Sequence, residues 1–358
     1  MKKRIWIAVF GSLCVFCLLF TLLSPHDEQK MKVCALLNGS IQDRSYTQAQ
    51  YDALAEACEN LGLDLAWFDK VPFDDTFSTL ARRMIEDGYG VVVCDNYLYE
   101  PYLTELAAEY PHIYFLNASG TESAGNYASY LGRMYQARYL SGLVAGARTE
   151  TGQIGYVLSF LTPETIRQLN AFTIGVRKTN PEARVYVRRT NDWNSAEKAS
   201  SVTSMLLDAH NIDVLTLHVN AISPLRVADK RGVYTIGNNY DNRELFPDTY
   251  LTACVFQWEP FFEERLSECV RGQFTGRNYW EGLRSGLVAL SPLTELVSDS
   301  TRRLVNAELG RLMNGTFDVF FGPVTDSYGT LQVREHENLS DRELLYGMYW
   351  FVDGVIME

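Results

Sequence analysis

The sequence lacks the compact motifs that mark common catalytic chemistries. It has no GxSxG nucleophile turn, no HExxH zinc motif, no phosphate-binding P-loop and no GxGxxG dinucleotide turn. Only five histidines occur among 358 residues, and no two are close enough in sequence to form a metal-binding pair. Scattered carboxylates could supply acid–base chemistry, but solvation at the surface accounts for most acidic residues. We therefore expect no catalytic residue, no metal and no cofactor.

Positive charge is also scarce. The 32 basic residues are outnumbered by 44 acidic ones, for a formal charge of −12. Because nucleic-acid binding needs a basic face, this balance predicts no nucleic-acid partner. Beyond residue 23 there is no CxxC motif, which argues against structural zinc. We interpret Cys34, Cys58, Cys94, Cys254 and Cys269 as buried hydrophobes, with a disulfide as the open alternative.

One long apolar run is present, at the N-terminus. Three basic residues at 2–4 precede 19 uncharged, mostly apolar residues at 5–23, which is typical of a secretory signal or a membrane span. The residues before Cys14 and Cys17 do not fit a lipoprotein signal. We expect residues 1–26 to be a signal or membrane anchor, with an uncleaved anchor favoured. The rest of the chain would then lie on the extracytoplasmic side of the cell membrane.

Short apolar runs then alternate with amphipathic segments. The runs predict strands in two series, at 31–37, 64–68, 90–94 and 112–116, then at 154–158, 185–189, 213–217 and 233–236. Helical spacing predicts helices at 47–60, 77–86, 101–109, 135–147, 164–178 and 196–209. Continuous apolar strands alternating with helices indicate parallel sheets covered on both faces. Two such series predict two similar α/β lobes.

The pattern changes from residue 252 onward. We expect a strand at 252–256, an aromatic-rich helix at 260–271, a strand at 286–290, a helix at 300–312, and runs at 317–322 and 330–333 around a turn at 326–329. These late segments could complete both lobes, with the chain crossing between them at a hinge. We assign 31–150 plus about 259–315 to the N-terminal lobe, and 151–258 plus about 316–358 to the C-terminal lobe.

The segments that follow the predicted strands combine aromatic rings with Asn and Asp side chains. Ligands of open parallel sheets bind outside the carboxyl ends of the strands. Flat apolar faces with hydrogen-bonding edges suit a purine or another planar heterocycle, for which stacking contributes about 1–3 kcal/mol per base. The alternative is that each Asn or Asp caps the next helix and each aromatic ring packs within a lobe. Their concentration after predicted strands favours a ligand cleft.

Several segments resemble the basic membrane protein (BMP) family of substrate-binding proteins. They lie at 135–146, 159–167, 170–177, 279–283, 319–323 and 348–355, the last with a closing Trp-aromatic-Val-acid-Gly-Val motif. The resemblance runs from about residue 31 to the C-terminus. It implies a type I periplasmic-binding-protein fold of two doubly wound lobes with three crossovers. Such proteins deliver purine nucleosides or purine bases to ABC importers.

The resemblance also implies site residues, position by position. Tyr46, Phe160 and Trp258 are expected as stacking faces, while Asn220 and Asn239 replace the Asp that family members commonly have. An Asn donates and accepts where an Asp only accepts, so the ligand's hydrogen-bond pattern would differ. The full expected ligand-binding set is Asp43, Tyr46, Asp95, Tyr97, Phe160, Glu164, Trp193, Asn220, Asn239, Asp241 and Trp258.

These observations predict a membrane-tethered, extracytoplasmic solute-binding protein. It would capture a purine base or nucleoside between two lobes for an ABC importer, with the permease as its protein partner. The alternative is a membrane-anchored ligand sensor or regulatory protein of the same fold. That alternative follows from the missing lipoprotein signal, because some family members with an N-terminal membrane segment act in regulation.

Overall fold

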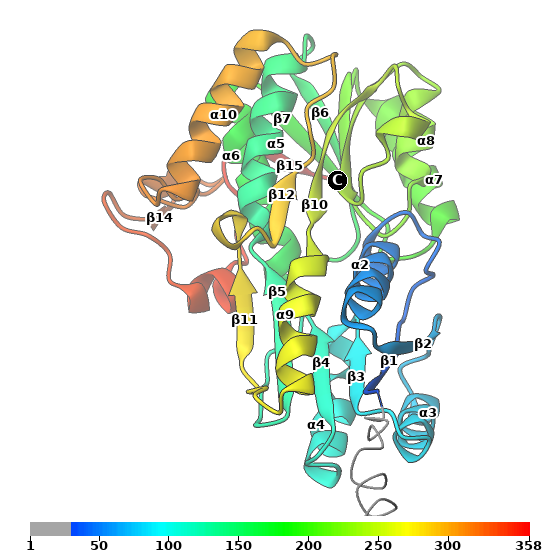
Figure 1. Cartoon of the computed structure of the whole chain (residues 1–358). Coiled ribbons are helices and arrows are strands. Elements are labelled where there is room, and N and C mark those ends of the chain that lie inside the picture. Colours follow the sequence, from blue (N-terminus) through cyan, green and yellow to red (C-terminus); the bar gives the residue numbers. More distant parts are fainter. Residues whose placement is uncertain (1–29) are drawn as a thin grey trace, which may run out of the picture.

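A computed structural model describes residues 30–358 as two α/β lobes (Figure 1). The N-terminal lobe contains a six-stranded sheet of order β11-β5-β4-β3-β1-β2, in which every pairing is parallel. Its strands are β1 (Lys32–Leu36), β2 (Asp64–Phe68), β3 (Val91–Cys94), β4 (Tyr114–Ala118), β5 (Tyr127–Gly132) and β11 (Asn278–Glu281).

Helices cover both faces of this sheet, as the continuous apolar strands predict. One face carries α2 (Tyr46–Leu61) and α9 (Trp258–Val270), and the other carries α3 (Asp75–Glu86) and α4 (Glu100–Glu109). Successive side chains of a strand point to opposite faces. Val33 therefore joins the core under α2 and α9, while its neighbour Cys34 joins the core under α3 and α4.

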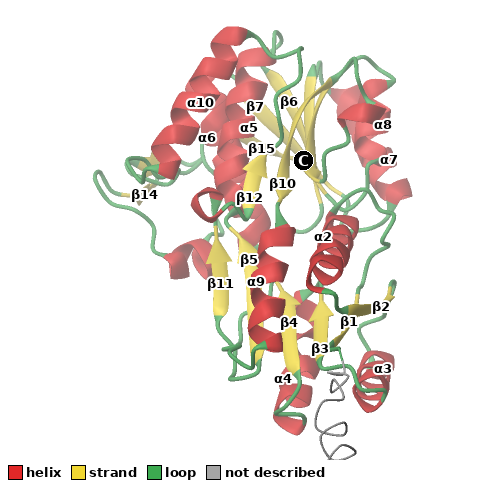
Figure 2. Ribbon diagram, viewed as in Figure 1, coloured by secondary structure: helices red, strands yellow, loops and turns green. Residues whose placement is uncertain are grey.

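The C-terminal lobe contains a seven-stranded sheet of order β12-β10-β9-β8-β6-β7-β15 (Figure 2). Only its β10–β12 pairing is antiparallel. The strands are β6 (Gln153–Leu158), β7 (Arg184–Arg189), β8 (Val214–His218), β9 (Tyr234–Asn239), β10 (Tyr250–Phe256), β12 (Val288–Leu290) and β15 (Val355–Met357). The helices α5 (Met134–Arg148), α6 (Pro163–Thr179) and α10 (Asp299–Met313) pack on one face, and α7 (Ala196–Ala209) and α8 (Ser223–Asp229) on the other.

Glycines bring α5 and α6 into backbone contact. A Cβ added to Gly142 would lie 2.1 Å from the carbonyl oxygen of Phe172, and one added to Gly175 would lie 2.1 Å from that of Tyr139. Neither position can hold a side chain unless the helices move apart. The small residues of the segments that resemble the BMP family therefore serve the packing of the C-terminal lobe.

The chain crosses between the lobes three times, after β5, after β10 and after β11. The crossing segments touch one another: a Cβ on Gly132 would lie 2.4 Å from the ring of Phe256 and 2.6 Å from Val288. The three crossings therefore form one packed hinge. This confirms the two-lobed periplasmic-binding-protein fold that the sequence predicted.

The lobes divide the chain at different residues from those that the sequence predicted. The segment 31–150 was assigned to the N-terminal lobe, yet its last helix, α5, packs against α6 in the C-terminal core. The segment 259–315 likewise contributes only α9 and β11 to the N-terminal lobe, because β12 pairs with β10 and α10 packs against α5. Periodicity shows where a helix ends but not which sheet it covers.

Several short elements carry no clear sequence pattern. Strands β5 and β11 and helix α8 were not predicted, and residues 317–322 are not a strand. The predicted turn at 326–329 does close a hairpin of β13 (Val324–Thr325) and β14 (Leu331–Val333). The remaining short helices are η1 (Tyr97–Tyr99), η2 (Arg243–Leu245), η3 (Leu283–Ser285) and η4 (Glu343–Gly347).

The cysteines after residue 30 are all buried and unpaired, as the interpretation of small hydrophobes requires. Between residues 30 and 358, every helix is too short or too polar to cross a membrane. The predicted signal or anchor at 1–26 lies outside the described residues.

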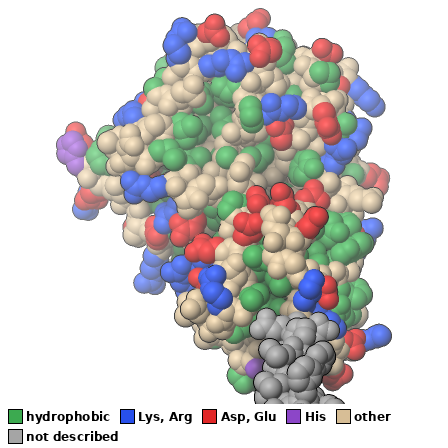
Figure 3. Space-filling view, in the orientation of Figure 1, with side chains coloured by type: hydrophobic (Ala, Val, Ile, Leu, Met, Phe, Trp, Pro, Cys, Tyr) green, Lys and Arg blue, Asp and Glu red, His purple; other side chains and the backbone are tan. Residues whose placement is uncertain are grey.

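Acidic side chains gather on the face formed by α2 and the start of α9 (Figure 3). The carboxylates of Glu56 and Glu263 add to desolvation in raising the pKa of Glu259. This acidic face would repel a polyanion.

Candidate ligand-binding site

A narrow cavity lies between the lobes, at the carboxyl ends of strands from both sheets. Its free volume is about 50 Å³, more than the roughly 10–15 Å³ that one water needs. This is the position at which open parallel sheets bind ligands. The lining residues are Tyr46, Asp95, Asn96, Tyr97, Ser119, Glu164, Gln168, Trp193, His218, Asn220, Asn239 and Phe256.

Aromatic rings bound this cavity from both lobes and from the hinge. Tyr46 begins α2, Tyr97 follows β3, and Trp193 follows β7. Phe256, the last residue of β10, lies at the second crossing with its ring centroid 5.9 Å from that of Tyr46. Tyr97 is 45% exposed, so much of its ring is not covered by protein. The site therefore has aromatic faces on both lobes.

Asp95 forms part of the polar lining but is held by its own lobe. Its carboxylate accepts hydrogen bonds from the amide of Asn38, at 2.8 Å, and from the hydroxyl of Thr47, at 2.9 Å. It is buried, and this burial raises its pKa to about 6 despite those hydrogen bonds. Asp95 therefore fixes the loop after β1 against α2 and leaves little of its carboxylate free.

His218 is a buried polar group in the lining. It is the last residue of β8, its side chain is 5% exposed, and its Nδ1 has no hydrogen-bond partner within residues 30–358. Burial lowers its pKa well below the usual value, and the charges of Arg138 and Arg167 lower it further. The imidazole is therefore neutral at physiological pH, with one nitrogen that donates and one that accepts.

A buried arginine orients Gln168 toward the cavity. The guanidinium of Arg138 donates to Oε1 of Gln168 at 3.2 Å, so the amide nitrogen of Gln168 points the other way. That nitrogen donates to Oε1 of Glu164 at 3.4 Å. Burial raises the pKa of Glu164, which favours its neutral form. The α6 side of the cavity thus offers an amide donor beside a carboxyl group.

The two Asn residues that replace Asp join different partners. Asn220 donates from Nδ2 to Oδ1 of Asn194 at 3.3 Å. Asn239 ends β9 and donates from Nδ2 to the hydroxyl of Ser45 in the opposite lobe at 3.5 Å. Both side chains line the cavity, so the polar lining from the C-terminal lobe contains uncharged amides at the two positions where the resemblance implies carboxylates in relatives.

Four expected ligand residues do not line the cavity. Trp258 is 1% exposed and packs in the N-terminal core, with its ring stacked 4.3 Å from Phe256. Phe160 is 38% exposed and lies beside Trp193, at 6.1 Å between ring centroids. Asp43 accepts hydrogen bonds from the amides of Ser45, Thr47 and Gln48 and so holds the start of α2.

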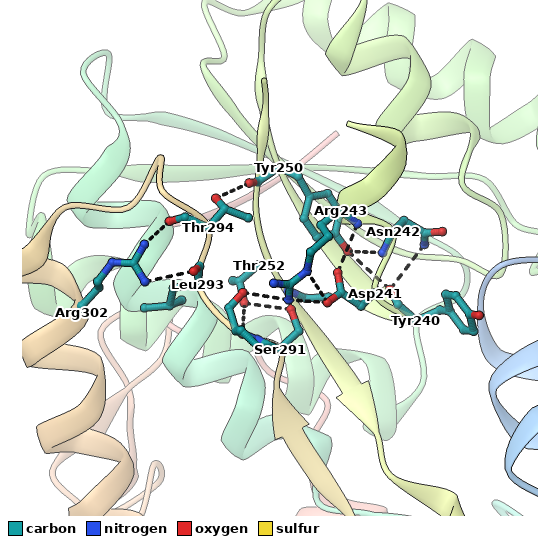
Figure 4. A network of polar contacts seen from close by, with 12 residues as sticks. Tyr240, Asp241, Asn242, Arg243, Tyr250, Thr252, Ser291, Leu293, Thr294 and Arg302 are labelled. Atoms are coloured by element: carbon teal, nitrogen blue, oxygen red, sulfur yellow. Dashed lines mark hydrogen bonds and ion pairs between the residues drawn. The ribbon is translucent and has the colours of Figure 1, made fainter. Parts of the chain in front are cut away.

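Asp241, the fourth, points toward Arg243 (Figure 4) and is not among the residues that line the cavity. Its carboxylate pairs with the Arg243 guanidinium, which also donates to the carbonyl of Pro292 at 2.9 Å. The backbone amide of the adjacent Asn242 donates to the hydroxyl oxygen of Tyr250 at 3.1 Å. This network fixes the loop between β9 and β10.

The structure brings the other expected residues together, namely Tyr46, Asp95, Tyr97, Glu164, Trp193, Asn220 and Asn239. It adds Asn96, Ser119, Gln168, His218 and Phe256, which the expected set omitted. Four of these five end a predicted strand or lie in the loop that follows one. The expectation that ligands bind at the carboxyl ends of the strands could therefore have identified them. Gln168 could be found only from its position one helical turn after Glu164.

A family model described as "ABC transporter substrate-binding protein PnrA-like" (Bmp) matches residues 30–316. The chain belongs to this family. This confirms the resemblance drawn from the sequence. A purine-binding protein of Brucella abortus is 29% identical to this PnrA-like protein over 93% of the chain and 95% of its own length.

Two other matches show how widely the fold is used. A protein of Haloferax volcanii that bears the provisional name of an ABC transporter glucose-binding protein is 30% identical over 74% of this chain and 65% of its own length. The crystal structure of a transcriptional activator of the comK gene from Bacillus halodurans superposes with a TM-score of 0.71. It has 19% identity and covers 80% of this PnrA-like protein and 99% of its own chain.

Proposed function

We propose that this PnrA-like protein captures a purine base or nucleoside outside the cell and delivers it to the permease of an ABC importer. The observation that carries the proposal is the interlobe cavity, which has aromatic rings on both lobes and a polar edge of mostly uncharged groups. A purine presents two flat faces and a rim of alternating hydrogen-bond donors and acceptors. Both features meet a counterpart in this site.

The polar edge matches a neutral heterocycle better than a charged ligand. His218 is neutral and can donate or accept, and Asn220 and Asn239 can do both. The amide nitrogen of Gln168 adds a fixed donor. The only ionisable acids of this edge are Asp95 and Glu164, and their raised pKa values make them poor partners for a cationic ligand. The residues that line the cavity include no Lys or Arg to pair with an anionic ligand. The name of the Brucella relative supports the same ligand class.

We further propose that residues 1–26 tether the protein to the extracytoplasmic side of the membrane. The support is the sequence alone: basic residues at 2–4 followed by an uncharged run at 5–23. A tethered binding protein remains close to the permease, which raises the effective concentration of the loaded form.

A thermal-shift screen of the full-length chain tests the proposed ligand class. A ligand at about 100 times its dissociation constant stabilises the folded state by about 2.7 kcal/mol, which raises the midpoint by several degrees. We expect shifts with adenine, guanine, hypoxanthine or their nucleosides and none with glucose. A shift with glucose alone would contradict the proposal and favour the ligand named for the Haloferax relative.

Ligand sensing is the second candidate function. The likeness to a solved structure named as a transcriptional activator supports this candidate. The fate of residues 1–26 separates the two functions. An intact N-terminus on protein recovered from membranes, identified by mass spectrometry, would favour a signalling anchor. A cleaved or lipidated N-terminus would favour the importer subunit.

A further inference from the structure

A buried arginine contacts several residues at or next to the interlobe cavity. Arg138 lies on α5, is 0% exposed and is not among the residues that line the cavity. Its guanidinium donates four hydrogen bonds, to Oε1 of Gln168 at 3.2 Å, Oγ1 of Thr216 at 3.2 Å, the carbonyl of Leu217 at 2.9 Å and Oδ1 of Asn238 at 2.6 Å. One side chain of α5 thus holds α6, β8 and β9 together.

This arginine is an expensive element of the core. Removing a charged group from water is costly unless hydrogen bonds or an opposite charge replace the lost solvation. All four acceptors of Arg138 within residues 30–358 are uncharged, so hydrogen bonds alone replace it. An apolar side chain of similar volume would fill the same space without that cost. The guanidinium therefore indicates a role beyond filling the core.

Three of these contacts fix residues of the cavity lining. Gln168 lines the cavity itself. The carbonyl of Leu217 belongs to the peptide unit that joins it to His218, and a third acceptor belongs to the residue directly before Asn239. His218 and Asn239 both line the cavity. Because Arg138 does not line the cavity, it can act on a ligand only through these three side chains.

The contact with Gln168 also determines the hydrogen-bonding direction of the cavity wall. A guanidinium has no acceptor, so the atom of Gln168 that it holds must be the amide oxygen. The amide nitrogen then points to the other side, where it donates to Oε1 of Glu164 at 3.4 Å. The second hydrogen of that nitrogen has no partner among the described residues, so it is available to a ligand. Without Arg138 the amide could turn over and offer its oxygen instead.

We infer that Arg138 is the positioning residue of this site: it fixes Gln168 as a hydrogen-bond donor, so that the protein selects a ligand with an acceptor opposite α6. The inference rests on the proposed function, since it concerns the same site. A ring nitrogen or a carbonyl of a purine meets this requirement. An amino group in the same place does not, because two donors would then face each other.

Gln168→Glu tests the inference because it should change stability and affinity differently. The new carboxylate gives Arg138 a counterion and removes the donor from the cavity wall. We expect the melting temperature of Q168E to be at least that of the wild type. The affinity should fall at least about fivefold, as expected for a polar group of the ligand left without its partner. Isothermal titration of the full-length protein with adenine, guanine, hypoxanthine and their nucleosides measures the affinity.

Arg138→Met should weaken the same ligand at least about fivefold. The loss should be smaller when Gln168→Ala is already present, because Arg138 acts partly through that side chain. Arg138→Lys, whose ammonium also only donates, should restore part of the affinity. Arg265→Met is the matched control: Arg265 is a buried arginine of the N-terminal lobe, 2% exposed and outside the cavity. It should lower the melting temperature and leave affinity within twofold.

Wild-type affinity in Q168E, or losses from R138M and Q168A that simply add, would overturn the inference. The proposed function would stand in both cases, because the wild type would still bind a purine. If R138M does not fold, Q168E and R138K decide between the outcomes. If the wild type binds none of the six compounds, the proposed function itself fails and this inference with it.

Discussion

Alanine substitutions at two tryptophans separate the core of the protein from its binding site. Trp258 is 1% exposed, and its ring packs against the rings of Phe256 and Tyr130, at centroid distances of 4.3 and 5.3 Å. Truncating a buried Trp costs about 3–5 kcal/mol because a cavity remains. At about 2–4 °C per kcal/mol, Trp258→Ala should lower the melting temperature by about 6–20 °C.

Trp193 should behave in the opposite way. It lies in the loop after β7, is only half-buried, and forms a wall of the cavity. Losing one stacking face costs about 1–3 kcal/mol of binding, which is about a 5- to 150-fold rise in the dissociation constant. Few core contacts are lost, so the melting temperature of Trp193→Ala without ligand should stay within about 3 °C of the wild type, or about 1 kcal/mol.

Calorimetric melting without ligand and titration with a purine ligand measure the two effects independently. Trp67→Ala provides the control for loss of an exposed indole, since Trp67 is 41% exposed. The reasoning is refuted if Trp258→Ala melts like the wild type and abolishes binding, which would place Trp258 in the site as the sequence suggested. It is also refuted if Trp193→Ala leaves the dissociation constant unchanged.

Three further predictions follow from single side chains. Burial raises the pKa of Asp95 in the folded state to about 6, from an ordinary value of 3.8. Between about pH 4 and 6 the folded state therefore binds more protons than the unfolded state. The free energy of unfolding falls as pH rises through that window. Urea denaturation at the two ends of the window should show that Asp95→Asn removes up to about 3 kcal/mol of this fall. If the variant loses as much unfolding free energy with rising pH as the wild type does, Asp95 is not its source. His218→Ala should weaken ligand binding about fivefold in titrations, and wild-type affinity should show no inflection near pH 6.5, because burial keeps this imidazole neutral. Gly142→Ala should lower the free energy of unfolding by about 1–3 kcal/mol and leave affinity unchanged, because its Cβ would meet the backbone of α6 and not the cavity; a denaturant titration showing no loss would refute the close packing.

The sequence predicts the sheets well where strands are buried on both faces. Almost every side chain of β1 and β3 is apolar, and short apolar runs that alternate with amphipathic helices are typical of strands covered on both sides. The sequence does not predict strand β5, because Ser129 interrupts its apolar residues, although that side chain is buried in the structure. The lobe to which α5 belongs could not be predicted for another reason. It depends on which sheet the helix covers, and periodicity carries no information on that.

The position of Trp258 in the structure has a local geometric cause. Phe256 ends β10 and Trp258 begins α9, two residues later. In a continuing strand the two side chains would share one face. The chain instead turns into a helix between them, so the Trp258 ring folds back onto the core while the Phe256 ring borders the cavity. Counting residues from the end of a strand does not reveal where the helix starts within such a short connection.

Contacts across the cleft determine how strongly the ligand controls closure. At the rim, Arg44 pairs with Glu244 at 2.8 Å and Tyr240 donates to Asp52 at 3.4 Å, and the charged groups of the ion pair are well exposed. Exposed pairs of this kind contribute about 0–1 kcal/mol each. Moving an equilibrium between open and closed forms from 1:99 to 99:1 needs about 5.5 kcal/mol of differential binding. Further hydrogen bonds cross the cleft, from Asn239 to Ser45 and from Asn242 to the carbonyl of Arg44. A ligand that touches Tyr46 in one lobe and Trp193 in the other would add stacking to these contacts. Under the proposed function, closure of the lobes would report occupancy, which is the property that both a permease and a signalling partner require.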